Sequence, residues 1–256
     1  MPPLPRISIH AHIDSMPTRI WTPWRHTACA AGTTQTGHSD DMDPEGDAVD
    51  VVRRGYDALS LRYRADDAPA GQYGPWIEEL LRRLPPAARV LDVGCGCGVP
   101  VARDLAAAGH RVTGVDLSGV QIERARNIVP RAKFVHGDVT TLTWPAASFD
   151  AVVALYSIIH IPLSRQPSLL AAFARWLVDN GVLLLTAGAH AWTGSERGWL
   201  GGDADMWWSH SDAETYRGWL TATGFRVDGE HFVPAGNSGH SLFWATRHAD
   251  PQYNQK

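Results

Sequence analysis

The sequence has few cysteines, and this limits the kind of protein it can be. It has three in 256 residues, Cys29, Cys95 and Cys97, too few for the disulfide framework of a small secreted domain. The first residues, MPPLPRISIHAHIDSMP, have no basic segment followed by an apolar one, as a secretory signal would. We therefore expect a cytoplasmic protein.

Long apolar runs and an excess of basic residues are also missing. No run reaches the roughly 18 apolar residues that a membrane-spanning helix needs. The net charge of −4, from 23 Lys and Arg against 27 Asp and Glu, argues against binding to a nucleic-acid backbone. We expect a small-molecule partner, no nucleic acid, no membrane, and either a monomer or a homodimer.

The N-terminal part differs in composition from the rest. Residues 1–43 are rich in Pro, Thr, His and Gly and have no sustained apolar period, which predicts a disordered or loosely attached tail. Met42 lies just before the first convincing helix and is a candidate natural start. Residues 44–256 are predicted to form a single domain, beginning with a helical lid over 48–84.

Short apolar strands then alternate with helices. Such alternation predicts a parallel sheet covered on both faces, and the last two strands are close enough in sequence to form an antiparallel hairpin. A capping box of Ser211 and Glu214 begins the last helix. The fold class is therefore α/β: a Rossmann-like, seven-stranded, mostly parallel sheet with helices on both faces and an antiparallel edge hairpin. The predicted strands are 89–94, 111–116, 132–138, 149–157, 182–188, 225–233 and 240–248, and the predicted helices between them are 99–109, 118–129, 167–178 and 211–224.

The stretch VLDVGCGCGVPVA joins the first of these strands to a helix. Gly94, Gly96 and Gly98 alternate in it with Cys95 and Cys97, which leaves a ligand loop, a metal or redox site, or a sharp turn open. The dinucleotide pattern G-x-G-x-x-G lacks its third glycine, and no G-K-[ST] is present. Two cysteines without a second Cys or His pair are a weak metal signal, so we expect small buried loop residues and no metal.

Acidic residues end the next two strands. Asp116 lies about 20 residues beyond the glycine loop, the usual distance for a carboxylate that binds ribose, and Asp138 ends the third strand. Either residue alone would also suit a helix cap or a turn. Together with D-x-G-x-G-x-G and FDAVVALYSIIHIP, they resemble the class I S-adenosylmethionine-dependent methyltransferases over roughly residues 50–248.

That resemblance implies S-adenosylmethionine as the cofactor and assigns its contacts. The implied contacts are Tyr63 closing over the cofactor, Asp92, Gly94, Gly96 and Gly98 at the methionyl part, Leu155 near its amine, Asp116 at the ribose, and Leu117, Asp138 and the Val139 amide at the adenine. Instead of contacting the adenine, Leu117 could equally be a plain core leucine.

Two residues after the fourth strand are candidates for catalysis. Methyl transfer from a sulfonium needs alignment and water exclusion, and needs a base only if the acceptor must lose a proton. His160 is the candidate general base, with a structural, hydrogen-bonded histidine as the alternative interpretation. Tyr156 is a candidate for lining or orienting the acceptor.

An insertion over 188–210 holds several of the 11 tryptophans. Its glycines indicate a mobile lid, and aromatic walls would suit a planar or cationic acceptor. The alternative is that these rings pack the lid onto the domain. The predicted substrate-binding residues are Trp192, Trp207, Trp208 and His210.

The predicted function is methyl transfer by direct displacement to a small aromatic or heteroaromatic specialised metabolite, indole- or phenol-like. Three alternatives stay open. A nucleic-acid methyltransferase is disfavoured because LYSI stands where an Asn/Asp-Pro-Pro-aromatic motif would be. A nicotinamide-dependent oxidoreductase is disfavoured by the missing third glycine, and a non-catalytic S-adenosylmethionine-binding protein by the aromatic insertion.

Overall fold

The computed structural model describes residues 44–236 and 238–248, so the tail predicted for residues 1–43 lies outside the described residues. Nine strands are found in the described part: β1 (Arg89–Val93), β2 (Arg111–Asp116), β3 (Lys133–His136), β4 (Phe149–Ala154), β5 (Leu177–Gly188), β6 (Trp192–Glu196), β7 (Met206–His210), β8 (Phe225–Ala235) and β9 (Ser238–Arg247). The α-helices of the same part are α1 (Pro44–Tyr63), α2 (Gly74–Arg83), α3 (Val101–Ala107), α4 (Gly119–Ile128), α5 (Gln166–Trp176) and α6 (Ala213–Ala222). Short 3₁₀ turns are η1 (Gly71–Tyr73), η2 (Ile158–His160), η3 (Leu163–Arg165) and η4 (Trp199–Gly201).

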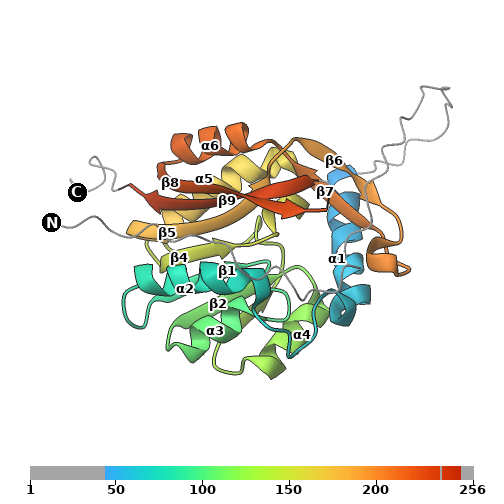
Figure 1. Ribbon diagram of the computed structural model, residues 1–256, viewed down its shortest axis with the longest axis horizontal. Coiled ribbons are helices and arrows are strands. Elements are labelled where there is room, and N and C mark those ends of the chain that lie inside the picture. Colours follow the sequence, from blue (N-terminus) through green and yellow to red (C-terminus); the bar gives the residue numbers. More distant parts are fainter. Residues whose placement is uncertain (1–43, 237, 249–256) are drawn as a thin grey trace.

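Seven of these strands form one sheet in the order β3-β2-β1-β4-β5-β9-β8 (Figure 1). Strands β1 to β5 pair in parallel, and β9 runs antiparallel to both β5 and β8. The chain moves outward from β1 in one direction and from β4 in the other. The predicted fold class is confirmed, and the reversal between β1 and β4 is where open α/β sheets bind ligands.

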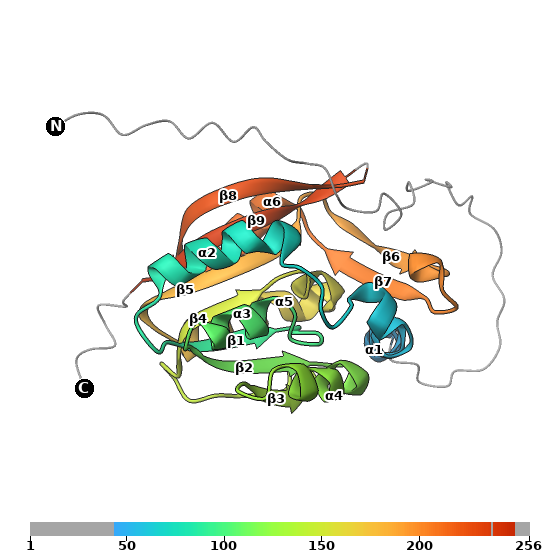
Figure 2. The same ribbon diagram turned by 60° about the horizontal axis from the view of Figure 1, so that its bottom comes forward.

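Helices cover both faces of this sheet. Figure 2 shows α2, α3 and α4 in front of it and α5 behind. Val90 of β1 belongs to the buried cluster that contains Leu80 of α2 and Leu105 of α3, whereas the next residue, Leu91, belongs to the cluster that contains Phe173 of α5. All five side chains are fully buried, and each contributes about 1.5–3 kcal/mol of hydrophobic stabilisation. Burial on both faces explains why the parallel strands are almost continuously apolar.

Helix α1 does not lie on a face of the sheet. It stands across the carboxyl ends of the parallel strands, beside β7 and α4 (Figure 1). A Cβ on Gly55 would lie 2.8 Å from both the Asp205 carbonyl oxygen and the Met206 Cε atom, so the helix and β7 are closely packed. The Ser60 hydroxyl donates to the Gln121 side chain of α4 at 2.9 Å. Of the helical lid predicted over 48–84, the structure places α1 and the following segment with Arg64, Gln72 and Tyr73 at this end, while α2 packs on the sheet.

The insertion is more regular than expected. Strands β6 and β7 form a separate antiparallel pair, which was not predicted. The signal for β6 was present, because Trp192 and Gly194 alternate with Thr193 and Ser195. Its connection contains η4, which begins after Gly198 in the left-handed region at φ 63°. The insertion is thus a two-stranded unit that packs against α1.

Several predicted boundaries differ from those of the structure, and two of them concern helix ends. Helix α5 ends at Trp176 and β5 begins at Leu177, so the helix predicted over 167–178 ends earlier and the strand predicted over 182–188 begins earlier. Asn180 lies inside this strand with a φ of 61°. The cap of α6 is Asp212 instead of Ser211: its carboxylate accepts from the Thr215 N–H at 2.9 Å. Both residue types cap helices, and the choice depends on which residue takes the extended backbone conformation.

Candidate functional site

Two adjoining clefts lie at the carboxyl ends of β1 to β4. The larger has a volume of about 750 Å³ and the smaller about 400 Å³. Tyr63, Gly94, Gly96 and Leu155 line both, so the clefts are two parts of one site. This site occupies the reversal point of the strand order.

The glycine loop turns on residues with positive φ. Gly94, Gly96 and Gly98 have φ values of 69°, 53° and 80°, in the region that favours glycine. A Cβ on Gly96 would meet no protein atom within 4 Å, whereas one on Gly94 would lie 2.4 Å from the Ser157 Cβ. Gly96 therefore keeps space open for a ligand, while Gly94 allows the loop to pack. Gly98 lies outside the lining of both clefts, with Val129 3.2 Å from its would-be Cβ.

The two cysteines of the loop are buried, at 7% and 2% exposure for Cys95 and Cys97. Burial raises the pKa of the Cys95 thiol well above its ordinary value, which keeps it protonated and unreactive. Across residues 44–236 and 238–248, no three His, Cys, Asp or Glu side chains are grouped so that they could hold a metal ion. Both cysteines are therefore buried loop residues, and both line the smaller cleft.

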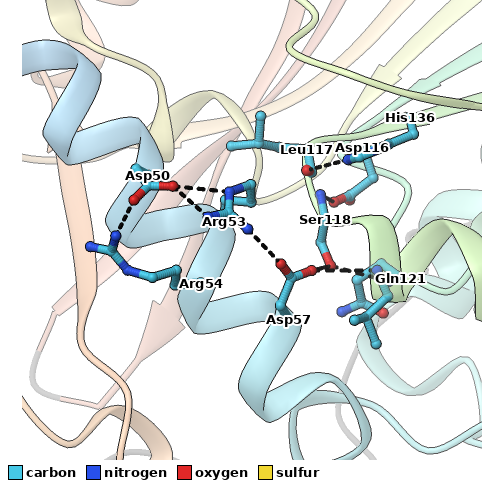
Figure 3. Close-up of polar contacts among 10 residues, drawn as sticks. Asp50, Arg53, Arg54, Asp57, Asp116, Leu117, Ser118, Gln121 and His136 are labelled. Atoms are coloured by element: carbon cyan, nitrogen blue, oxygen red, sulfur yellow. Dashed lines mark hydrogen bonds and ion pairs between the residues drawn. The ribbon is translucent and has the colours of Figure 1, made fainter.

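Asp116 lies at the end of β2, in the lining of the larger cleft. One carboxylate oxygen accepts from the Gly96 N–H and the other from the Ser118 N–H, both at 2.8 Å; Figure 3 shows it beside Ser118. Burial raises its pKa to about 6, against the opposing effect of these two hydrogen bonds. Each oxygen has a further lone pair, so the carboxylate can still accept from ligand hydroxyl groups.

A second carboxyl group faces the smaller cleft. Asp92 is 3% exposed, and its Oδ2 has no hydrogen-bond partner in the described structure. Burial, reinforced by the nearby Asp116, raises its pKa to about 8. The Ser157 Oγ, in the lining of the larger cleft, is also buried without a partner among the described atoms. Buried polar groups are nearly always satisfied, so both atoms indicate a place for a polar ligand.

Asp138 forms a local turn and also lines the larger cleft. One oxygen accepts from the Thr140 N–H and hydroxyl, both at 2.8 Å, as in an Asx turn. The other lies 3.7 Å from the Arg165 guanidinium. The residue still lines the larger cleft, together with Leu117 and Val139. A local turn therefore holds this carboxylate at the edge of the site.

His160 is buried in η2 and has both ring nitrogens occupied. Nδ1 lies 2.7 Å from the Trp207 carbonyl oxygen and Nε2 lies 3.0 Å from the Tyr56 hydroxyl. A carbonyl only accepts, so Nδ1 carries the hydrogen and Nε2 accepts from Tyr56. Burial lowers the pKa of His160 to about 4, and the ring is therefore neutral at pH 7.

Tyr156 also lines the larger cleft but has different partners. Its backbone is in the left-handed region, with φ 55°, and its N–H donates to the Thr186 hydroxyl. The phenol oxygen accepts from the Gln72 side chain at 3.0 Å, and the ring lies edge-on to His240 at 5.1 Å. The structure thus brings Tyr156 and His160 to one cleft without placing them in one hydrogen-bond network.

The aromatic residues predicted to bind substrate lie beside the clefts. None of Trp192, Trp207, Trp208 and His210 is among the described residues that line either cleft. The Trp208 ring packs 5.6 Å from His160, and Trp207 contacts His160 through its backbone carbonyl. The His210 Nδ1 lies 2.8 Å from the His190 carbonyl. The insertion therefore supports His160 from outside the cleft.

Sequence reasoning missed several lining residues. Tyr56 precedes Tyr63 by two helical turns, so both lie on one face of α1, and this spacing was the signal that could have identified it. The Arg64 guanidinium lies 4.9 Å from the ring centre of Tyr73 in the smaller cleft. The other missed residues of the larger cleft are Val49, Val52, Val93, Val115, Gly137, Ser157, Ile161 and Pro162.

Comparisons with known proteins agree with this geometry. Residues 90–181 match the family model described as a methyltransferase domain. The 27-O-demethylrifamycin SV methyltransferase of Amycolatopsis mediterranei is 41% identical over 80 residues, which are 29% of this chain and 29% of that protein. The chain thus spans less than a third of the length of the curated relatives it matches.

Two solved structures share the fold at low sequence identity. The Burkholderia thailandensis 1,6-didemethyltoxoflavin-N1-methyltransferase, solved with 1,6-didemethyltoxoflavin and S-adenosylhomocysteine, has a TM-score of 0.63 and 19% identity over 83% of this chain and 94% of that one. The [4+2]-cyclase SpnF has a TM-score of 0.61 and 19% identity over 77% of this chain and 95% of that one. These similarities show the fold, and the site must decide the chemistry.

Proposed function

We propose that this chain, a member of the class I S-adenosylmethionine-dependent methyltransferases, transfers a methyl group to a small aromatic or heteroaromatic metabolite, indole- or phenol-like. The observation that carries the proposal is the composition of the larger cleft. Of the described residues that line it, only Asp116 and Asp138 are carboxylates, and none is Lys or Arg. Apart from the Ser157 hydroxyl, its remaining wall is apolar or aromatic, which suits an uncharged planar acceptor.

The residues present fit the cofactor. The open space at Gly96 and the unpartnered oxygen of Asp92 suit the methionyl part with its cationic groups. We assign the ribose hydroxyls to Asp116 and the adenine to Leu117, Asp138 and the Val139 amide. Leu155 and Tyr63 line both clefts, as residues near the methionine amine and the closing aromatic should.

One further cofactor contact is proposed from the structure. Arg64 lies in the smaller cleft with Asp92 and the glycine loop, and no ion pair joins it to a carboxylate of the described residues. Its guanidinium would pair with the cofactor carboxylate, while Asp92 takes the ammonium group.

When bound, S-adenosylmethionine supplies a methyl group already activated by the positively charged sulfur. The protein must then align the acceptor and exclude water. We propose that His160 handles the acceptor proton and that Tyr156 orients the acceptor. Contact of Trp192, Trp207, Trp208 and His210 with the acceptor stays a prediction, tested by replacing Trp207 and Trp208 separately with alanine and measuring acceptor affinity.

The names of the relatives support a small-molecule acceptor. One acts on 27-O-demethylrifamycin SV and the other was solved with 1,6-didemethyltoxoflavin. In the described residues no helix is long and apolar enough to cross a membrane. The cytoplasmic location, the monomer or homodimer and the absence of a nucleic-acid partner stay predictions.

Cofactor binding is tested by calorimetric titration with S-adenosylhomocysteine. We expect Asp116→Ala to weaken binding at least about tenfold, because a buried hydroxyl pair loses its charged acceptor. Asp203→Ala, which removes an exposed carboxylate outside both clefts, is the matched control and should bind like the wild type. Equal affinity of the Asp116 variant and the wild type would contradict the assignment.

Turnover is tested with methyl-labelled S-adenosylmethionine and a panel that includes phenol and indole. Label in an organic-soluble product supports the proposal. Parallel titrations with NAD and NADP distinguish the oxidoreductase alternative, since that protein would bind a nicotinamide cofactor and leave S-adenosylhomocysteine unbound. Binding of S-adenosylhomocysteine without transfer to any acceptor would favour the non-catalytic alternative.

A further inference from the structure

Tyr56 and His160 form a hydrogen-bonded pair in the wall of the larger cleft. Tyr56 comes from α1 and His160 from η2, 104 positions apart, and their side chains meet at 3.0 Å. Both residues line the cleft. The rings are nearly perpendicular, at 89°, with centroids 5.5 Å apart. Long-range folding therefore brings a phenol and an imidazole together beside the acceptor space.

The direction of the hydrogen bonds in this pair is fixed from outside the cleft. The Trp207 carbonyl, 2.7 Å from Nδ1, accepts the imidazole hydrogen. The Nε2 lone pair is then the acceptor for the Tyr56 hydroxyl. As a result, the Tyr56 hydroxyl donates its hydrogen to His160, and its oxygen has a lone pair that faces the cleft and can accept a hydrogen bond. A group that binds there must itself be a hydrogen-bond donor.

The pair carries no charge at neutral pH. Burial, together with Tyr63, Asp116 and Tyr73 around it, raises the pKa of Tyr56 well above its ordinary value. Burial, together with His240 and His210, lowers the pKa of His160 to about 4, against the effect of the Trp207 carbonyl. Neither group would remove a proton from a resting phenol or indole.

Resting on the methyl transfer proposed above, we propose that Tyr56 accepts a hydrogen bond from the acceptor's O–H or N–H and relays that proton to Nε2 of His160. The acceptor heteroatom forms a bond to the methyl carbon as the carbon–sulfur bond breaks, its electron pair remaining on sulfur. The acceptor proton moves to the Tyr56 oxygen as the Tyr56 proton moves to Nε2. The imidazolium keeps its Nδ1–H on Trp207 and releases the extra proton to solvent when the product leaves.

A weak base is sufficient for this relay. An oxygen or aromatic nitrogen that has just gained a methyl group while still holding its hydrogen is a far stronger acid than an imidazolium, even one of lowered pKa. An aliphatic ammonium, with a pKa of about 10, would keep its proton. The site therefore selects hydroxyl and heteroaromatic N–H acceptors, and neither an alkene nor a tertiary amine offers the hydrogen that Tyr56 accepts.

The first test reads the direction of the hydrogen bonds without turnover. Nitrogen NMR of the full chain with S-adenosylhomocysteine should show His160 protonated at Nδ1 and hydrogen-bonded at Nε2 at pH 7. Tyr56→Phe should shift the Nε2 resonance and leave Nδ1 in place. Trp144→Phe, which alters an aromatic ring outside both clefts that contacts Phe149 and Trp176, is the control and should shift neither. Protonation at Nε2 would overturn the proposal, because the Tyr56 hydroxyl would then donate into the cleft.

The second test separates catalysis from binding. With phenol and indole as acceptors, Tyr56→Phe should lower kcat about 100-fold, within the range for proton transfer by a positioned side chain. Its affinity for S-adenosylhomocysteine should change less than about twofold. The double variant with His160→Gln should lose no more than the single variant, because the two residues act as one relay. A Tyr56→Phe protein that keeps kcat within about twofold overturns the relay, whereas loss of cofactor binding in the wild type would contradict the proposed function alone.

Discussion

The two walls of the site are built from different chemistry. The sheet wall consists of backbone turns and carboxylates at the ends of β1 to β3. The opposite wall, here called the aromatic cover, consists of α1 and the insertion β6-η4-β7. In the cover, the rings of Tyr56, Tyr63 and Trp199 lie 5.1–5.7 Å apart. The first wall suits a fixed polar ligand, and the second suits varied apolar ones.

The walls also differ in how they are held. Fully buried strand residues on both faces of the sheet support the first. The cover rests on ring contacts and a few polar links, such as the bonds that Arg62 donates to the Leu200 and Gly201 carbonyls at 3.1 and 2.7 Å. Regions with fewer buried contacts open at lower free energy. We therefore expect the cover to be weakened more easily than the sheet wall, and cofactor recognition to depend less on it.

The largest expected effect comes from removing the central ring of the cover. Trp199 is 6% exposed, and Trp199→Ala should cost about 3–5 kcal/mol of local stability, typical of a buried aromatic residue replaced by alanine. Hydrogen exchange should rise in α1, β6 and β7 and stay low in β1 and β4. Affinity for S-adenosylhomocysteine should fall only a few-fold.

The exposed Phe232 of β8, at 59%, provides the matched control. Phe232→Ala should leave exchange in the cover unchanged. If Trp199→Ala instead raised exchange throughout the central sheet, the two walls would unfold as one unit and the comparison would fail.

Within the sheet wall, Gly94 and Gly96 of the same loop should differ in their effects on stability and on cofactor affinity. Gly94→Ala places a methyl group 2.4 Å from the Ser157 Cβ at a φ of 69°, so we expect a loss of roughly 2–4 kcal/mol from backbone strain and overlap. Gly96→Ala meets no protein atom and should cost only about 1 kcal/mol of strain, while cofactor affinity falls at least about tenfold. Thermal unfolding and titration of both variants check this. Equal effects of the two variants on stability would show that Ser157 moves to make room for the added methyl group.

The sheet wall could be predicted from the sequence because its signals are local. Glycines between a strand and a helix, and acids at the ends of the next strands, become neighbours once the strands are parallel. Gly96 and Asp116 needed only the strand order to meet, at 2.8 Å. The loop and the acid therefore carried most of the information about the cofactor.

The cover could not be predicted to the same depth. Tyr56 contacts a histidine 104 positions away, and no local sequence pattern predicts such a contact. Tryptophan composition drew attention to the insertion, but the contact that Trp207 makes with His160 comes from its carbonyl, a group that every residue has. The contribution of the insertion therefore depends on the path of its backbone, which cannot be predicted from the identity of the side chains.

The pH dependence of stability should have opposite signs for Asp92 of the sheet wall and for His160 of η2, which is hydrogen-bonded to the cover through Tyr56 and Trp207. The pKa of Asp92 is raised to about 8 in the folded state, so it contributes stability that is lost as the pH rises from about 4 to 8. The pKa of His160 is lowered to about 4, so its contribution is lost as the pH falls from about 6.5 to 4. Each slope approaches about 1.4 kcal/mol per pH unit.

The difference in free energy of unfolding between a variant and the wild type, measured against pH, isolates the contribution of each residue. Denaturant unfolding of Asp92→Asn should become progressively more stable relative to wild type as the pH rises. His160→Gln should gain relative stability as the pH falls. Slopes of the same sign would contradict the charge states assigned to Asp92 and His160.

The smallest expected effect concerns a polar link between the walls. Figure 3 shows Asp57 of α1 pointing at Ser118, beside Asp116; its carboxylate accepts from the Ser118 hydroxyl at 2.6 Å and pairs with Arg53 at 3.0 Å. Asp57→Asn should cost about 1 kcal/mol, the usual net value of such a hydrogen bond. It should also weaken S-adenosylhomocysteine binding about two- to threefold, because Ser118 also holds Asp116.

Asp50→Asn is the matched control for this link, since it removes a carboxylate on the same helix that pairs only with Arg53 and Arg54 among the described residues. An exposed pair of this kind contributes about 0–1 kcal/mol, and Asp50 has no contact with the loop that holds the cofactor. Unfolding and titration should therefore distinguish the variants chiefly by cofactor affinity. If both variants bind S-adenosylhomocysteine equally well, the hydrogen bond between Asp57 and Ser118 does not couple the two walls. The cover and the sheet wall would then recognise their ligands independently.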